Sequence, residues 1–408
     1  MSSYSDLLKT PGVARIISAQ LVARFPFGMI SLAFLLHIEQ ITGSYGAAGL
    51  VLAATSVGQA VAGPLTSRFM GRWGMRPVIT ATLIVCATMV TIIALVPMSV
   101  PMYMIVGALS GLSMPPIQPA VRTIYPKMVN SRQLTPLFSL DATAQEIIWV
   151  VGPVVTTFVS TQVGTIWGIL LAVLFMVGGG IWFIASPELG RVRIPRSKRK
   201  LGAVLRRPPV LLATGVGFLL VGACAAVEAA VVATFGHGGA EAGIVLAIFS
   251  IGSIAGGLGL GHVPIGPWST ARRMLIVFVG MGLAAIVMAV FTNNEVFWWV
   301  SGALFIAGIG IAPALAVLFA IVSASVKFSD TAEAYGWVGT GQLIGAALGS
   351  AAAGFLIDGS GAVGGFWAAG VFALVGVIVP VLAVRWHPDL RGRDASPMPD
   401  TEAVPVQS

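Results

Sequence analysis

The sequence predicts an all-α polytopic membrane protein in which twelve transmembrane helices form two six-helix bundles related by pseudo-two-fold symmetry. Three observations predict this architecture. Apolar runs of about 20 residues recur along the chain, and a helix of that length crosses a hydrocarbon core of ~30 Å. Lys and Arg gather in every second connection between the runs. The first six runs also share a residue pattern with the last six.

Each run should be a helix, because backbone groups in lipid must form hydrogen bonds within their own segment. The short alternating segments of a membrane β-barrel do not occur in the sequence. The first six expected spans are residues 13–37, 45–67, 77–96, 101–125, 136–161 and 164–185. The last six are residues 209–235, 240–261, 272–291, 296–323, 331–357 and 361–384.

The distribution of positive charge predicts the orientation. Of the 23 Lys and Arg residues, all but Arg24 lie at one set of span ends and in the loops that join them. Cytoplasmic loops carry an excess of Lys and Arg, so we expect both termini in the cytoplasm and the protein in the cytoplasmic membrane. The net charge of +8 is then topogenic, and we expect no nucleic-acid partner.

The densest positive cluster divides the chain into domains. Eight Lys and Arg residues fall within residues 186–208, with six spans on either side. We expect an N-terminal bundle over residues 1–185, a basic cytoplasmic linker over 186–208 and a C-terminal bundle over 209–385. The linker is expected to be a solvated topology anchor, or alternatively to contact anionic lipid headgroups. The polar, Pro-rich tail, residues 386–408, is expected to be disordered.

The two halves of the chain repeat each other. Ser56 and Gly58 correspond to Ser250 and Gly252 at an offset of 194 residues. Residues 107–109 match residues 302–304, and further matches occur between spans 5 and 11. Together the matches pair span 2 with span 8, span 4 with span 10 and span 5 with span 11, in the same topology. Parallel six-helix repeats about an axis along the membrane normal are one transporter architecture.

The chain from about residue 11 to 384 resembles the major facilitator superfamily. Arg72, Gly74 and Arg76 fit the family's loop after helix 2, Gly-x-x-x-Asp-Arg-x-Gly-x-Arg/Lys. Gly71 stands where the family has its Asp, and Ser67 where it has its first Gly. In the family this Asp helps to lock one conformation, so the resemblance leaves the lock of this chain unexplained.

A second motif concerns helix 5. Gly152, Pro153 and Thr156 match the Gly-Pro-x-x-Thr core of the family's antiporter signature, whose upstream glycines are missing here. The Arg-x-Pro-x-Gly-Met run at residues 24–29 is similar to a branch of bacterial efflux-type members. The resemblance implies a transporter that exports a small organic molecule in exchange for protons by alternating access.

Charged residues within the spans are candidates for coupling, because intramembrane charge costs about 2.5 kcal/mol or more. Arg24 and Glu146 should each lie ~15 Å along their helices from the cytoplasmic side. We expect them to face the cavity and pair, with Glu146 taking a proton when substrate draws Arg24 away; the alternative is a permanent structural ion pair. Asp141 and Arg122 are expected to pair at the inner gate, and Glu228 to be a second proton or cation site or part of an outer polar network.

Proline interruptions in spans 1, 4 and 10 are expected to mark the substrate cavity, because such breaks are tolerated where helices line a cavity. They include Pro26 and, in the two halves, Pro115 and Pro313. Polar and aromatic candidates for the cavity wall, for which ordinary helix packing is the alternative, are Gln118, Gln145, Trp149, Tyr335, Trp337 and Gln342.

The sequence contains no P-loop, no His-Glu-x-x-His and no Cys-x-x-Cys, and its four His residues are scattered. We therefore expect no catalysis, no metal and no cofactor, and a monomer whose partners are a small molecule, protons and lipids. An importer or facilitator of a sugar or metabolite is the alternative function. A lipid-modifying enzyme would need clustered Asp or His, and a sensor would not need midplane charges.

Overall fold

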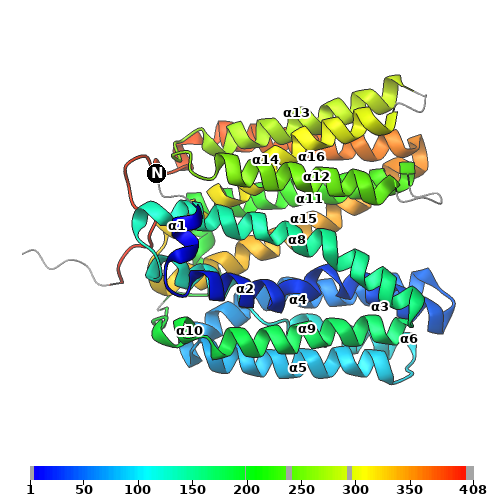
Figure 1. Ribbon diagram of the computed structural model, residues 1–408, viewed down its shortest axis with the longest axis horizontal. Helices are drawn as coiled ribbons and strands as arrows, with labels where there is room; N and C mark the ends of the chain where they lie inside the picture. The colour runs from blue at the N-terminus through cyan, green and yellow to red at the C-terminus, as the bar shows by residue number, and fades with distance from the viewer. Residues whose placement is uncertain (1–3, 198, 236–240, 292–295, 401–408) are drawn as a thin grey trace, which may run out of the picture.

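The computed structural model describes residues 4–197, 199–235, 241–291 and 296–400. Across these residues, twelve helical segments are long and apolar enough to cross a membrane. Six precede the linker and six follow it, and the two sets occupy the lower and upper halves of Figure 1. The predicted fold of two six-helix bundles is confirmed.

The first bundle contains two broken spans, both at the predicted prolines. Pro26 lies in a short 3-10 turn, and Pro115 lies in a non-helical break between two helices. The elements of this bundle are α2 (Val13–Arg24), η1 (Phe25–Gly28), α3 (Ile30–Thr42), α4 (Tyr45–Trp73), α5 (Met75–Leu95), α6 (Val100–Leu112), α7 (Ile117–Ile124), η2 (Tyr125–Lys127), α8 (Ser131–Gln162) and α9 (Thr165–Ala185).

The second bundle follows a linker that contains two short helices. The linker elements are α10 (Pro187–Arg191) and η3 (Ala203–Arg206). The bundle consists of α11 (Pro208–Phe235), α12 (Glu241–Leu260), α13 (Ser269–Val290), α14 (Val296–Ser325), α15 (Phe328–Ser360) and α16 (Ala362–Leu382), and two short elements flank the whole, α1 (Tyr4–Lys9) and η4 (Val384–Trp386).

The predicted interruption of span 10 is wrong, because α14 continues through Pro313. Pro313 has no N–H group for the carbonyl four residues earlier, that of Ile309. This carbonyl lies against Gly256 of α12, where a side chain would collide with it. The absence of a side chain at Gly256 leaves room for this carbonyl, and α14 stays helical through Pro313.

Helix α8 crosses η1 through a contact between two glycines. A Cβ added to Gly152 would lie 2.9–3.0 Å from backbone atoms of Gly28, closer than side chains pack. Small residues at such crossings let membrane helices approach each other closely. Gly152 of the sequence motif thus allows α8 to lie directly on the broken part of the first span.

We expect Gly152→Ala to lower the free energy of unfolding by about 1–3 kcal/mol, because the new methyl group must push two backbones apart. Thermal unfolding in detergent would measure the loss. The matched control is Gly178→Ala, since nothing lies within 4 Å of a Cβ at Gly178. Helix propensity favours Ala in both variants, so an equal change in both would rule out the expected clash at Gly152.

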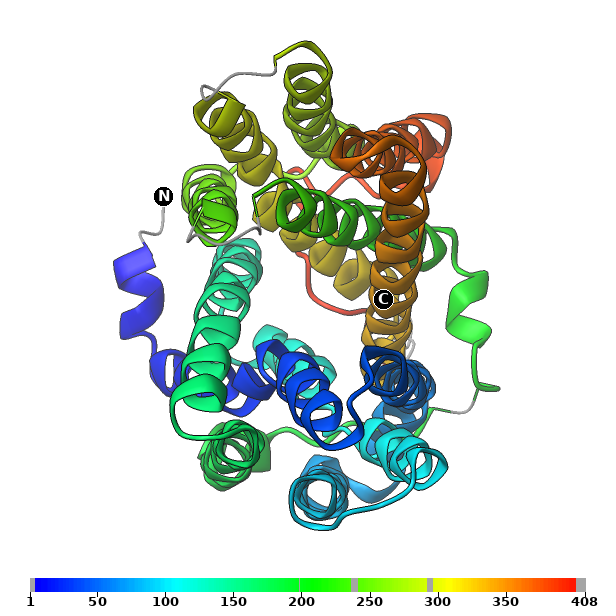
Figure 2. The ribbon, with the colours of Figure 1, turned by 90° about the vertical axis from the view of Figure 1, so that its right-hand side faces the viewer.

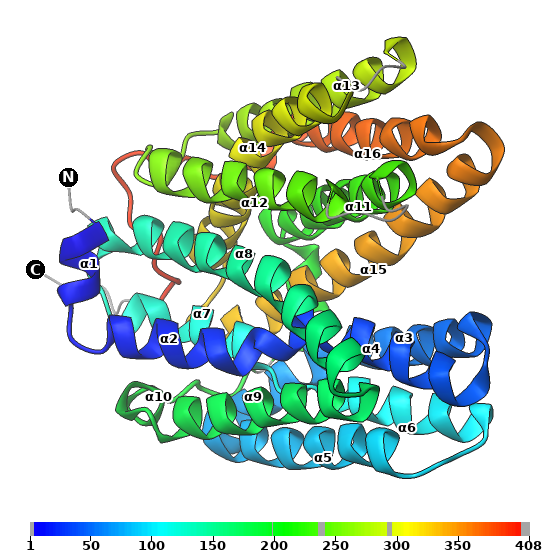
Figure 3. The same ribbon diagram turned by 45° about the vertical axis from the view of Figure 1, so that its right-hand side comes forward.

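Helix α1, the linker and the C-terminal tail all lie at one end of the molecule, together with the loops that carry most of the Lys and Arg residues (Figure 3). We call it the basic end. Helices α4 and α15 contact each other near this end and diverge toward the opposite end (Figure 3). Figure 2 views the molecule from the opposite end, where the two sets of helices form separate groups. The bundles are therefore closed against each other at the basic end.

The tail departs from the predicted disorder over its described part, which ends at residue 400. Leu390 N–H donates to the carbonyl of Ile265 at 2.9 Å, and Met398 N–H donates to that of Val326 at 2.9 Å. Ala395 is buried. Leu390 and Ala395 give this segment apolar side chains to pack against the core, which the composition argument overlooked. Residues 401–408 lie outside the described residues.

The tail should detach on acidification, because burial lowers the pKa of His387 below its usual 6.5. The nearby Arg273 guanidinium lowers it further, while the Pro388 carbonyl and Asp389 act in the opposite direction. With a lowered pKa the neutral imidazole favours the packed state, so the contact is intact above about pH 6.5 and weakens as the pH falls below it. The protection factors of the Leu390 and Met398 amides, which correct for the intrinsic pH dependence of hydrogen exchange, should fall between pH 7.5 and 5, and should lose this pH dependence in His387→Gln.

Candidate functional site

A buried ionic cluster lies between α2, α7 and α8. Arg122 Nε donates to Asp141 Oδ2 at 2.9 Å, and Arg24 Nη1 donates to Oδ1 at 3.3 Å. The hydroxyl of Tyr125 also donates to Oδ1, at 3.1 Å. The two guanidiniums and the carboxylate are at most 3% exposed. One carboxylate thus neutralises one of two buried positive charges.

Amide side chains complete the cluster. Gln20 donates to Asp141 at 3.1 Å and accepts from Arg24 at 2.7 Å. Gln145 accepts hydrogen bonds from both guanidiniums, and Gln118 presents its amide oxygen to Arg122. These oxygens bind the N–H groups that the single carboxylate leaves free, as buried charge requires.

The cluster also contacts the second bundle. The Arg122 guanidinium lies 3.4 Å from the ring centroid of Phe319 on α14, a cation–π contact. Phe319 packs in turn against Phe138 of α8 and Tyr335 of α15, with ring centroids 6.3–6.5 Å apart. An aromatic contact between the two bundles therefore covers the ionic cluster.

The predicted pairing of Arg24 with Glu146 is wrong, because Arg24 pairs with Asp141. The predicted pairing of Arg122 with Asp141 is present in the structure. Helix α8 begins at Ser131, five residues before the predicted start. Asp141 therefore lies ~15 Å into its helix, level with Arg24, at 1.5 Å per residue. Glu146 lies ~7.5 Å further along, beyond the reach of that guanidinium.

Glu146 instead connects α8 to the second bundle. Its Oε1 atom accepts from Ser253 Oγ of α12 at 2.9 Å, and Ser253 Oγ accepts from the amide of Ala312 on α14 at 3.2 Å. The Glu146 side chain is 9% exposed. Glu228 of α11 is close enough to interact electrostatically with Glu146, yet its own side chain is exposed. The two carboxylates thus border open space at the boundary between the bundles.

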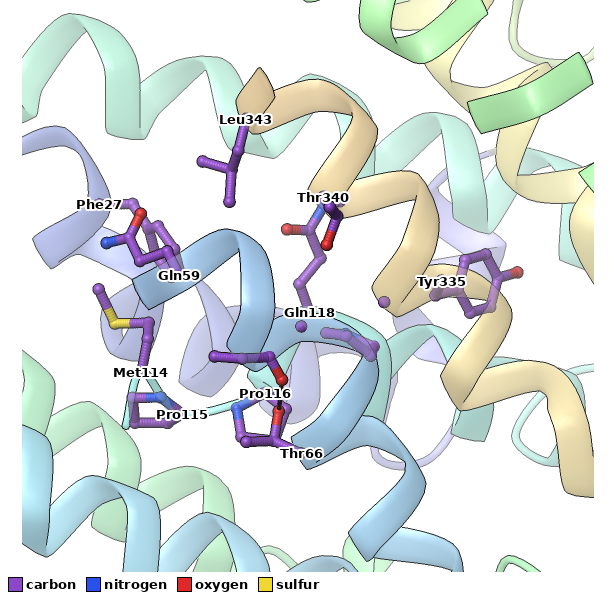
Figure 4. A pocket seen from close by; sticks show the side chains of 15 residues that line it. Phe27, Gln59, Thr66, Met114, Pro115, Pro116, Gln118, Tyr335, Thr340 and Leu343 are labelled. Carbon is purple, nitrogen blue, oxygen red and sulfur yellow. Dashed lines mark hydrogen bonds between the residues drawn. The ribbon is translucent and has the colours of Figure 1, made fainter. Parts of the chain in front are cut away.

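A small cavity of about 70 Å³ lies between the broken spans and α15 (Figure 4). Its polar side chains are Gln59, Thr66, Gln118 and Thr340, and the remaining wall is apolar. In Figure 4, Gln118 and Thr340 approach each other from opposite bundles. Small-molecule sites have such apolar walls with a few placed polar groups but occupy about 300–1,000 Å³, so this cavity is the size of only a part of one.

The other predicted wall residues fall in different places. Tyr335 lines the cavity, but its hydroxyl donates to the Phe319 carbonyl at 2.9 Å. Trp149 is 48% exposed and lies outside the cavity wall. Trp337 packs toward Gly202 of the linker, and Gln342 faces α11. Two further predicted residues are adjacent to the cavity without lining it, namely Pro26 and Gln145.

The motif residues hold local structure. Gly74 has φ +93° and joins α4 to α5. Arg76 donates to the Ser186 carbonyl at 3.1 Å, whereas Arg72 is exposed and lies 5.6 Å from the ring of Trp73. Thr156 donates to the Gly152 carbonyl at 2.8 Å, one turn back across Pro153, which lies inside α8.

Several site residues escaped the sequence analysis, among them Gln20, Tyr125 and Ser253 in the hydrogen-bonded networks. Gln20 precedes Arg24 by four residues and so shares its helix face, which was a usable signal. Tyr125 and Ser253 had no such signal, because their partners come from other helices. Among the described residues no group of three His, Cys, Asp or Glu side chains could hold a metal.

Comparisons with known proteins agree with this geometry. The family model described as Major Facilitator Superfamily matches residues 16–256 and 222–406. The structure is similar to a bacterial homologue of the iron transporter ferroportin in an outward-facing state, with TM-score 0.72, 12% identity, and coverage of 92% of this chain and 98% of that chain. It is also similar to the human organic anion transporter MFSD10, with TM-score 0.67, 15% identity, and coverage of 91% and 100%. A search of curated proteins found no match.

Proposed function

The chain belongs to the major facilitator superfamily, so it is a multi-pass membrane transporter and not an enzyme, and from this premise we propose that it exports a small organic molecule in exchange for protons. Transport in this family is secondary and proceeds by alternating access, in which two bundles rock about a central site. The direction, the proton coupling and the substrate class are the proposed parts.

The observation that carries the proposal is the Glu146–Ser253 hydrogen bond beside Glu228. It joins the two bundles through an ionisable group deep in the membrane. Two nearby carboxylates repel each other when both are charged, and a proton on either removes the repulsion. Binding and release of that proton would therefore alter a contact that must change when the bundles move.

The Arg24–Asp141–Arg122 cluster has a structural part in this proposal. Its atoms are buried and mutually hydrogen-bonded, so it holds α2, α7 and α8 together. Its guanidiniums bind Asp141 and amide oxygens of the protein, with one positive charge in excess, and we assign the coupling to Glu146 and Glu228. This assignment replaces the exchange of Arg24 between Glu146 and substrate that the sequence suggested.

The orientation follows from charge. With the Lys- and Arg-rich end in the cytoplasm, both termini are cytoplasmic and the bundles are closed on the cytoplasmic side. The cavity of Figure 4, at about 70 Å³, would form only the part of the substrate site that lies at the closed end, and its amide and hydroxyl groups suit the polar end of an organic molecule with an apolar body. We propose a monomer in the cytoplasmic membrane, with the basic loops beside anionic lipid headgroups.

Proton movement in proteoliposomes tests the proposal. Vesicles that contain the protein and a pH-sensitive dye would receive a panel of apolar drugs and metabolites under an imposed pH gradient. Substrate-triggered loss of the gradient is expected. Uptake of a labelled compound down its own gradient, with no proton movement, would favour a facilitator over the antiporter.

A further inference from the structure

The linker between the bundles is bound to the helices that close the basic end. Within residues 194–202, Ile194 is buried, and a Cβ added to Gly71 of α4 would lie 3.2 Å from the Pro195 carbonyl oxygen. Arg68, one turn earlier on α4, donates to the carbonyl of Arg199. This part of the linker therefore lies directly on the first bundle, where a solvated anchor was expected.

The same segment binds two buried carboxylates of the second bundle. Asp330 and Glu333, in the first turns of α15, are 2% and 3% exposed. Ser197 Oγ donates to Asp330 Oδ1 at 2.6 Å, and the Gly202 amide donates to Glu333 Oε1 at 2.7 Å. The Arg199 guanidinium lies 3.8 Å from Asp330. Without the linker these acids would lose most of their partners, at a high cost for buried charge.

One residue connects all three parts. Arg68 donates through Nη1 to Glu333 Oε2 at 3.0 Å and through Nη2 to the Arg199 carbonyl. The bundles cannot separate at the basic end without breaking the Arg68–Glu333 bond and the contacts of the linker with either α4 or α15. Ser197 and Gly202 both bind α15, and η3 at the end of the linker contacts α11 and α15, so we expect the linker to stay with the second bundle.

We propose that linker residues 194–197 and 199–202 act as a latch, which travels with α15 and docks onto α4 to hold the basic end closed. The docking site is the part of α4 that carries Arg68 and Gly71, and Asp330 and Glu333 hold the latch on α15. The linker thus sets the balance between the two access states, in addition to connecting the bundles.

The distance between the bundles tests the latch without any substrate or proton flux, so its failure is separable from failure of the proposed transport. Spin labels would be attached at Trp73→Cys and Trp268→Cys, both exposed at the basic end, in a background with Cys86 and Cys224 replaced by Ala. Glu333→Gln should lower the ratio of short to long distances by about tenfold or more, because one partner of a buried pair is removed.

A variant of α4 isolates the latch from the direct Arg68–Glu333 pair. In Gly71→Leu the new side chain should push the linker off α4, because a Cβ at this position already lies 3.2 Å from the Pro195 carbonyl oxygen, while Arg68 and Glu333 stay unchanged. We expect the same shift to long distances. If the short distance persists, the direct ion pair alone closes this end and the latch is refuted.

The matched control is Glu188→Gln. Glu188 of α10 is also buried and paired with an arginine at the basic end, but its partner Arg15 lies on α2, so neither partner belongs to the second bundle. The distance distribution should stay that of the parent protein. A shift as large as in Glu333→Gln would show general loosening of the fold and would also overturn the latch. Gel filtration and helix content identify any variant that has not folded.

Discussion

Glu146→Gln should abolish substrate-driven proton movement and leave the protein folded. The amide is the same size as the carboxylate and can still accept the hydrogen bond from Ser253, which is 2.9 Å away in the parent. It cannot take up or release a proton at the pH of the assay. Dye-loaded proteoliposomes should therefore report the same pH trace as protein-free vesicles when substrate is added.

The effect should be specific to the position of the carboxylate. Glu241→Gln is the control, since Glu241 lies exposed at the start of α12, at the end away from the basic loops. It should retain full proton movement. Full movement in Glu146→Gln as well would place the coupling proton elsewhere, and Glu228→Gln would then decide whether the neighbouring acid carries it.

The architecture was predictable because membrane topology depends on short-range sequence properties. The length of each apolar run and the alternation of positive loops are local, and each requires no knowledge of tertiary contacts. The boundaries were less accurate where helices extend beyond the bilayer. Ser131 begins α8 within a polar stretch that hydropathy does not mark.

That boundary error accounts for the wrong partner of Arg24. A helix start five residues too late moves every depth estimate on α8 by ~7.5 Å, enough to exchange Asp141 for Glu146. The identity of the charged residues was predictable from the cost of intramembrane charge. Their pairing depends on registration between helices, which no local pattern in one sequence contains.

The contacts between the bundles were equally hidden. From the sequence alone, Asp330 and Glu333 are ordinary acidic residues at a helix N-terminus, where the helix dipole favours negative charge. Ser197 and Gly202 read as polar loop residues. Only the fold brings them to Arg68, 265 residues before its ionic partner Glu333. The substitution of Gly71 for an acid was visible in the sequence, but not the linker segment that lies against it.

Asp141→Asn should cause the largest loss of stability among single polar substitutions in the ionic cluster. The carboxylate is the counter-charge of both Arg24 and Arg122, and all three side chains are buried. Removing one partner of a buried ion pair costs about 3–5 kcal/mol, because the remaining charge has no compensation. In Asp141→Asn, two buried guanidiniums lose the same counter-charge. The midpoint of thermal unfolding in detergent would measure the effect.

A double substitution distinguishes lost charge balance from lost packing. Arg24→Gln alone leaves the Asp141–Arg122 pair in place, at 2.9 Å, and should cost less than Asp141→Asn. Combined with Asp141→Asn it leaves one uncompensated guanidinium instead of two, so the double variant should be more stable than the sum of the single losses predicts. Strict additivity would mean that Arg24 and Asp141 do not interact. A stable Asp141→Asn would mean that the guanidiniums reach water, contrary to their burial.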